Sequence, residues 1–297
     1  MGFPWYLIIP LICAGVYAAA SLIFKRAYAQ GLGMMEAFYW VNFAGMAFFV
    51  PMLFLAGPWP PLTEFWKPAA TASLIFCGTW ATFAAIRAGD VSLVTPLMGT
   101  KVVLTALVAV VMVPTSLPLG LWVAAGLTTV GILVLGWRDL QRGFGKAAAV
   151  GWCLLSSLLF AGADVSIGHW AADFGRPAFL GIVFVGIGLI SLAMVKWQAP
   201  KAFRVPVGAR SFLILGAVLM TLNTLAMALC IARSKDPTGV NIVYGTRGLW
   251  STGLVWFAGQ RWFGNDERHT AGREMPMRLV GSLLILTAVA VAVLAGR

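Results

Sequence analysis

The sequence predicts an all-α integral membrane protein with ten transmembrane helices, arranged as two inverted five-helix repeats. Three observations support this fold class. First, 60% of the 297 residues are hydrophobic and only 10% are charged, whereas a soluble domain carries about 25% charged residues. Second, the apolar residues fall into long runs without strand-like alternation. Third, a segment of the first half recurs in the second half with its charged residues in register.

The apolar runs have the length that a membrane-spanning helix requires, which is roughly 20 residues. Strands of a barrel would be about ten residues long and would alternate. Short connections rich in Pro, Gly and charged residues separate the runs, and the longest connection, 260–276, is expected to be a solvated loop. The expected spans are 3–24, 34–56, 68–87, 91–113, 117–137, 147–170, 178–197, 210–232, 238–260 and 277–295.

The internal repeat defines two halves. A shift of 146 residues aligns 87–108 with 233–254, and charged residues, which are rare in such helices, coincide at three positions. The fourth span therefore pairs with the ninth, and each half, 1–140 and 141–297, holds five spans. Because five is odd, the halves must have opposite orientations in the membrane, as in an inverted-topology repeat. The coinciding pairs are Arg87 with Arg233, Asp90 with Asp236, and Lys101 with Arg247.

Several segments resemble the drug/metabolite transporter superfamily, EamA-like branch. They are the run IRAGDVSLVTPLMGTKVVLTALVAVVMV, residues 25–27 (KRA) at the end of the first span and 136–138 (GWR) at the end of the fifth. The chain departs from this pattern at 113–116 (VPTS), which lacks the usual Glu, and it has no Tyr-Leu-Trp-Pro segment of the kind found in aromatic amino-acid exporters. The resemblance implies secondary transport of a small metabolite by alternating access. It also implies substrate contact by basic residues on the fourth and ninth spans.

Lys101 and Arg247 are the strongest candidates for substrate contact. Each follows, by eleven residues, an Asp that is expected to cap a helix, and Pro237 stands at the first position of the second helix. Eleven residues span about 16 Å, half of a hydrocarbon core of about 30 Å. A cation at this depth is costly unless it faces a cavity or a partner. We expect both cations to face one central cavity between the halves and to bind a carboxylate or phosphate there.

Asp164 lies well inside the sixth span. Three roles are open: counter-ion to Lys101 or Arg247, proton-coupling carboxylate, or ligand for the ammonium group of a zwitterion. If the cations only pair with such a carboxylate, they stabilise the fold and contact no ligand. The alternative function is then an exporter of neutral or cationic compounds.

Small and polar residues precede the two cations. Gly99 and Gly245 allow a ligand or a helix to approach the backbone, and the hydroxyls of Thr100 and Thr246 can donate to an oxyanion. Close packing of helices is the alternative role of these residues. Three further residues are expected to line the cavity: Trp80, Asn223 and Tyr244.

The charged corners before the fourth and ninth spans are candidate gates. Arg87 and Asp90 lie three residues apart, as do Arg233 and Asp236. The simpler interpretation is a capped, salt-bridged turn. The functional interpretation is a gate that opens and closes on alternate faces of the membrane.

Other classes of protein find little support in the sequence. A GxxxxGK[ST] segment for ATP, a surface cluster of catalytic residues and a repeated selectivity filter are all missing. The chain is therefore not expected to be an enzyme. Two His and four scattered Cys predict neither a metal nor a cofactor. The net charge of +11 lies mostly in short turns, where it sets topology and contacts lipid headgroups rather than nucleic acid.

We expect a multi-pass protein of the cell membrane, which in a bacterium is the inner membrane. Its expected partners are membrane lipids and an anionic or zwitterionic small molecule, and its expected state is a monomer or homodimer. Lys and Arg concentrate in the connections on one side of the membrane, and the positive-inside rule makes that side cytoplasmic and places both termini outside. The family resemblance implies that both termini are inside.

Overall fold

The structure is a computed structural model of the chain. It describes residues 5–55, 57, 59–88, 94, 97–113, 116–137, 141, 147–198, 203–250, 253–254 and 266–295. Within these ranges the regular secondary structure is entirely helical, which confirms the all-α fold class.

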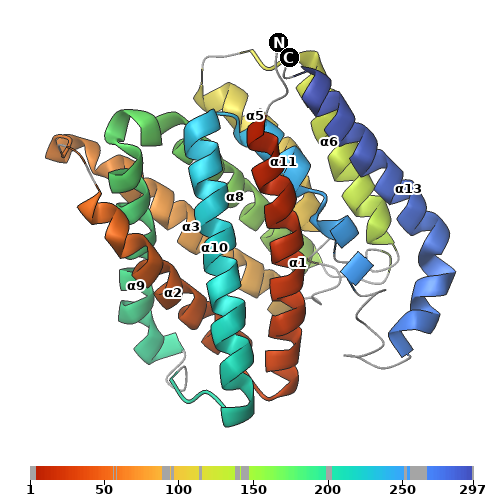
Figure 1. The fold of residues 1–297 in the computed structure, drawn as a ribbon, viewed down its shortest axis with the longest axis horizontal. Coiled ribbons are helices and arrows are strands. Elements are labelled where there is room, and N and C mark those ends of the chain that lie inside the picture. Colours follow the sequence, from red (N-terminus) through yellow and green to blue (C-terminus); the bar gives the residue numbers. More distant parts are fainter. Residues whose placement is uncertain are drawn as a thin grey trace. The chain divides into compact units, whose positions relative to one another are not determined.

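The described residues form ten α-helices, joined by short connections (Figure 1). Four short 3-10 helices precede α1, α3, α5 and α10; they are η1 (Trp5–Leu7), η2 (Leu62–Glu64), η3 (Met98–Thr100) and η4 (Val207–Ala209). The α-helices are α1 (Ile8–Ala29), α2 (Met34–Phe54), α3 (Trp66–Ala88), α5 (Lys101–Met112), α6 (Leu119–Leu135), α8 (Ala147–Phe174), α9 (Arg176–Gln198), α10 (Arg210–Ser234), α11 (Pro237–Tyr244) and α13 (Asp266–Ala295).

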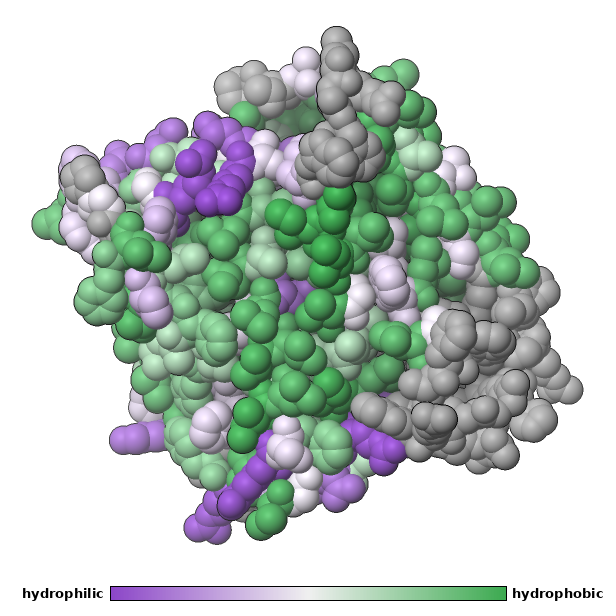
Figure 2. All heavy atoms as spheres, viewed as in Figure 1, coloured by the Kyte–Doolittle hydropathy of each residue, from purple (hydrophilic) through white to green (hydrophobic). Residues whose placement is uncertain are grey.

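Within the described part of the chain, five helices are long and apolar enough to cross a membrane by length and composition. They are α1, α2, α8, α9 and α10 with its preceding turn, and shorter apolar helices lie at Met98–Met112, Leu119–Leu135 and Leu279–Ala295. The surface over α10 is hydrophobic along its middle and hydrophilic at both ends (Figure 2). This is the pattern of a helix that crosses a hydrocarbon layer between two aqueous phases.

The structure corrects three sequence predictions. The sequence predicts one continuous span over 238–260, but α11 ends at Tyr244 and a turn follows at 245–246. In the expected span 91–113, a 3-10 turn occupies 98–100 and α5 begins only at Lys101. Both predictions rest on hydropathy, which does not change where an α-helix gives way to a turn or a 3-10 helix. The solvated loop expected over 260–276 is wrong from Asp266 onward, because α13 begins there; acidic residues in a first turn favour the helix.

The chain divides into two compact units. Unit 1 consists of Met1–Ala14, Leu74–Val165 and Asp236–Arg297, and unit 2 consists of Gly15–Ser73 and Ser166–Lys235. Each unit therefore combines segments from both halves of the sequence. The repeat boundary at 140, which concerns the internal symmetry of the sequence, stays a prediction.

Unit 1 is built on the close pair α6 and α13, which lie side by side (Figure 1). A Cβ on Gly131 of α6 would lie 2.7 Å from Cγ1 of Ile285, and one on Gly281 would lie 2.7 Å from the carbonyl oxygen of Gly131. Glycine at the contact lets the two backbones approach closely, as is common between helices in membranes. The short helices α5 and α11 also pack on α6.

Unit 2 is built on α2, which packs against α9 and α10. The rings of Phe49 and Phe184 stack between α2 and α9 with centroids 4.0 Å apart. On the same pair of helices, the Asn42 amide donates to Ser191 Oγ at 2.9 Å, which satisfies a polar group inside an apolar span. Ring stacking and this hydrogen bond fix the register of α2 on α9.

Candidate functional site

The first turn of α11 is organised by Asp236. Its carboxylate accepts a hydrogen bond from the backbone N–H of Gly239 at 2.8 Å, and Pro237 occupies the first helical position. The predicted N-cap is therefore confirmed. The hydroxyl of Tyr6 also donates to Asp236 at 2.7 Å. All eight residues of α11 are buried, so this cap anchors an internal helix of unit 1.

An ion pair joins α5 to α8 in the interior of unit 1. Lys101 Nζ lies 2.7 Å from Asp164 Oδ2, and the two side chains are only 17% and 16% exposed. The amide of Asn241 in α11 donates to the same carboxylate oxygen at 2.7 Å, and also to the Pro237 carbonyl at 2.8 Å. Three helices therefore converge on one carboxylate. A cation and an amide donor therefore both contact this carboxylate in a poorly solvated place.

Aromatic rings face both candidate cations. Lys101 Nζ lies 5.7 Å from the ring centroid of Phe160, one helical turn before Asp164 on α8. The guanidinium carbon of Arg247 lies 5.1 Å from the ring centroid of Tyr244. Both distances fall within the range of a cation–π contact.

Each cation follows a Gly-Thr pair at which the helix tightens. In the first half, residues 98–100 form the 3-10 turn η3, and the Thr100 hydroxyl donates to the Leu97 carbonyl at 2.7 Å. In the second half, the backbone N–H of Thr246 and its hydroxyl both donate to the Val243 carbonyl, at 3.1 and 2.8 Å. A bond to the third residue back characterises 3-10 geometry, which within a longer helix often marks a functional distortion.

Both Gly-Thr pairs rest on the same turn of α6. A Cβ on Gly99 would lie 2.6 Å from Cγ2 of Ile132, and a Cβ on Gly245 would lie 2.6 Å from Cγ2 of Thr128. Residues 128 and 132 are neighbours on one helix face. Thr129 in the same turn donates to the Gly99 carbonyl at 3.3 Å. One segment of α6 therefore positions the two distorted turns and, with them, Lys101 and Arg247.

The other predicted site residues are distributed more widely. Tyr244 is 9% exposed and lies beside Arg247, and Trp80 is a half-buried residue of α3. Asn223, which is 6% exposed, and the exposed Arg233 lie on the part of α10 that belongs to unit 2.

Half of the first predicted gate falls outside the described residues. Arg87 lies in α3, where the structure describes only its backbone, and Asp90 is not among the described residues. Of the second gate, Asp236 caps α11. Gating by these residues stays a prediction.

Sequence reasoning missed Asn241, Phe160 and Thr129. A signal for Asn241 existed, because it is an amide in an apolar span, four residues after Pro237 and so on the helix face that includes the Pro237 carbonyl. Phe160 and Thr129 carry no such signal, since aromatic and hydroxyl residues are frequent in these helices. Among the residues that the structure describes, no group of three or more His, Cys, Asp or Glu could hold a metal ion.

Long apolar helices, together with an ion pair and distorted helical turns inside unit 1, are typical of membrane transport proteins. Comparison with known families makes the class specific. The model of the EamA-like transporter family matches residues 4–137, and over this segment the chain belongs to that family. The family consists of transporters and not of enzymes, so the chain carries a small molecule across a membrane.

The fold is shared with solved structures, and 28 of their chains match. One of them, described only as the crystal structure of a protein, is 14% identical and superposes with a TM-score of 0.75, covering 100% of this chain and 99% of its own. At this identity the likeness concerns the fold alone. No curated protein sequence matches the chain.

Proposed function

We propose that the transported molecule carries a carboxylate or a phosphate and is bound by Arg247 together with Lys101. An amino acid or an organic acid has this chemistry. The observation that carries the proposal is the position of both cations directly after Gly-Thr turns that pack on one turn of α6. Such a placement brings two costly charges into one region of unit 1, where a structural role alone would not require either of them.

The chemistry of the charged side chains supports an anionic or zwitterionic ligand. The guanidinium of Arg247 can bind two oxygens of one carboxylate or phosphate. The carboxylate of Asp164 could receive the ammonium group of an amino acid in competition with Lys101.

The recurrence of the distorted turn supports the proposed repeat of 1–140 and 141–297. The shift of 146 residues maps Thr100 and its acceptor Leu97 onto Thr246 and its acceptor Val243. In the proposed mechanism the two halves move against each other and expose the cations to one side of the membrane at a time. An anion between the cations offsets their mutual repulsion and permits closure.

One observation favours the second candidate function, an exporter of neutral or cationic compounds. Lys101 already has a carboxylate partner at 2.7 Å, which is the arrangement expected of a structural cation. In that case both cations hold helices together, and the ligand contacts other parts of the molecule. The two candidates differ in which ligands bind and in the effect of removing the charges.

A thermal-shift experiment on the purified protein separates them. Amino acids, organic acids, sugar phosphates, neutral sugars and quaternary ammonium compounds are tested, since a ligand that binds only the folded state raises the melting temperature. We expect one anionic class to stabilise the protein. Replacing Arg247 with Gln is expected to weaken its binding about 10- to 100-fold, because hydrogen bonds to charged groups contribute about 1.5–3 kcal/mol.

The control removes an equal charge elsewhere. Lys196 is exposed in the last turn of α9, so Lys196→Gln leaves the candidate site intact. It should bind the anion as the unmodified protein does, and Arg247→Lys should retain part of the affinity. The result would support the exporter instead if only cationic or neutral compounds raise the melting temperature, and raise it equally in Arg247→Gln and the unmodified protein.

A further inference from the structure

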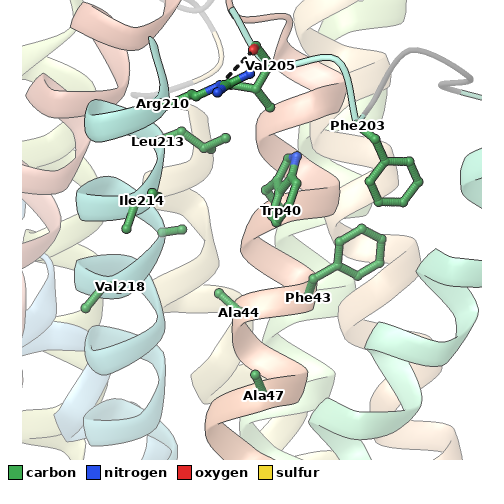
Figure 3. A pocket seen from close by; sticks show the side chains of 11 residues that line it. Trp40, Phe43, Ala44, Ala47, Phe203, Val205, Arg210, Leu213, Ile214 and Val218 are labelled. Atoms are coloured by element: carbon green, nitrogen blue, oxygen red, sulfur yellow. Dashed lines mark hydrogen bonds between the residues drawn. The ribbon is translucent and has the colours of Figure 1, made fainter. Parts of the chain in front are cut away.

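An apolar groove runs between α2 and α10 in unit 2. It has a volume of about 490 Å³ and lies between residues 40–47 of α2 and 203–218, which include the start of α10 (Figure 3). This volume is within the range of roughly 300–1,000 Å³ that small-molecule sites occupy. Ten of its eleven lining residues are apolar or aromatic, and the remaining one is Arg210.

The floor and walls of the groove have different exposures. Leu213 and Ala217 of α10 form the floor and are 4% and 6% exposed, and small Ala side chains of α2 also line the groove. Phe203 and Ile214 on the walls are 58% and 65% exposed. A trough with a buried floor and exposed apolar walls therefore opens on two helices that are both long enough to span a membrane. Its surroundings are then acyl chains rather than water.

An aromatic stack shapes one wall. The rings of Phe43 and Phe203 are parallel within 2° with centroids 5.9 Å apart, and Trp40 meets Phe203 edge-on at 6.1 Å. Trp side chains concentrate at the level of the lipid headgroups, so this end of the groove lies near the membrane surface.

Arg210 marks the polar end of the groove. Its Nε donates to the Val205 carbonyl at 3.4 Å, which turns the guanidinium toward the rim, where Figure 3 shows it. A guanidinium has five N–H donors, and those on its two terminal nitrogens can grip two oxygens of one phosphate. The apolar trough and the cation together match a molecule with a phosphate at one end and a hydrocarbon chain at the other.

The charge around Arg210 favours an anion. The connection before α10 packs on the connection after α1, since Pro206 lies 3.9 Å from the position of a Cβ on Gly31. These two connections and the helix ends beside them carry Lys25, Arg26 and Arg204 and one acidic residue, Glu36. Basic pockets between membrane helices bind anionic headgroups.

We propose that this groove binds an anionic phospholipid, with its phosphate on Arg210 and one acyl chain along the trough between α2 and α10. The residues that line the groove belong to unit 2 and the proposed substrate cations belong to unit 1, so this proposal does not rest on the proposed function. The trough is too large and too apolar for free phosphate alone. A water-soluble peptide would leave its backbone groups without partners on these walls.

Native mass spectrometry of the full chain in detergent tests the proposal with phosphatidylglycerol and phosphatidylcholine of identical chains. We expect tighter binding of phosphatidylglycerol. Arg210→Gln should reduce that preference about tenfold, because a charge-assisted contact is lost. Phosphatidylcholine should be weakened less, since its choline ammonium offsets the charge of its phosphate. Ala44→Phe, which fills the trough, should weaken both lipids, and circular dichroism checks that each variant is folded.

Lys196→Gln is the matched control, because it removes one exposed cation that does not line the groove. An equal loss of preference in Lys196→Gln and Arg210→Gln would overturn the proposal, since it would mean diffuse attraction to the whole basic end. The proposal also fails if the unmodified protein does not discriminate between the lipids. Displacement of phosphatidylglycerol by millimolar glycerol phosphate would assign a site for free phosphate instead. If Ala44→Phe does not fold, the charge comparison still decides.

Discussion

The ion pair between Lys101 and Asp164 should make a large contribution to folding that depends on both partners. Removing one charge of a buried pair leaves the other desolvated and costs about 3–5 kcal/mol. Since the two side chains are 17% and 16% exposed, some solvation remains, and we expect the lower value, about 3 kcal/mol, for Lys101→Met and for Asp164→Asn. The double variant removes both charges and should lose about 3 kcal/mol less than the sum of the two.

The free energies of unfolding are measured by circular dichroism as the protein in mild detergent micelles is titrated with sodium dodecyl sulfate. The matched control is the pair of Lys67 with Glu64, which lies at the start of α3 with 22% and 38% of the side chains exposed. Its coupling energy should be below about 0.5 kcal/mol, as for surface pairs within a helix. The coupling energy of Lys101 and Asp164 is the difference between the sum of the two single losses and the loss in the double variant. If it is also below about 0.5 kcal/mol, the ion pair does not hold α5 to α8 and the reasoning is refuted.

Three further results are expected. Gly245→Ala should destabilise the protein by about 1–3 kcal/mol, because its new Cβ would lie 2.6 Å from Cγ2 of Thr128. The control Gly126→Ala should not destabilise it, since a Cβ there would meet nothing within 4 Å. Equal effects of the two substitutions would contradict the close contact at Gly245. Asp236→Ala should lower the free energy of unfolding by about 1 kcal/mol, because the N-cap is lost. Asp236→Asn should lower it less, since the amide oxygen still accepts from Gly239. Both are measured by unfolding in detergent, and equal losses of stability would argue against capping. The distribution of Lys and Arg places the C-terminus outside, so a fused alkaline phosphatase should be active and a fused green fluorescent protein dark; the reverse would support the family expectation.

Local signals in the sequence predicted much of the architecture. Long apolar runs predicted the helices, and Asp236 followed by Pro237 predicted the start of α11, because N-caps and first-turn prolines have strong local preferences. The sequence also offered Asp164 as a counter-ion to Lys101, and the two are paired. A charged residue inside an apolar span carries such information because it needs a partner.

Features that depend on packing between distant segments could not be predicted in the same way. The contact of Gly99 and Gly245 with one turn of α6 arises from three helices that are far apart in the sequence. The sequence marks Asn241 as an amide inside an apolar span, but it does not show whether that amide binds a carboxylate or faces a cavity. The start of α13 at Asp266 was missed because a polar segment was taken as solvated, although charged residues also form helices readily.

The composition of the two compact units has a consequence for the biogenesis of the protein. In unit 1, α6 packs on α13, and in unit 2, α2 packs on α9, so the principal partner of each early helix is synthesised more than a hundred residues later. Glycine-lined faces such as that of Gly131 must remain against lipid, or against the insertion machinery, until α13 has been translated. A ribosome that stalls after the fifth span therefore leaves neither unit assembled, and two separately expressed halves can restore both units only by meeting within the same bilayer.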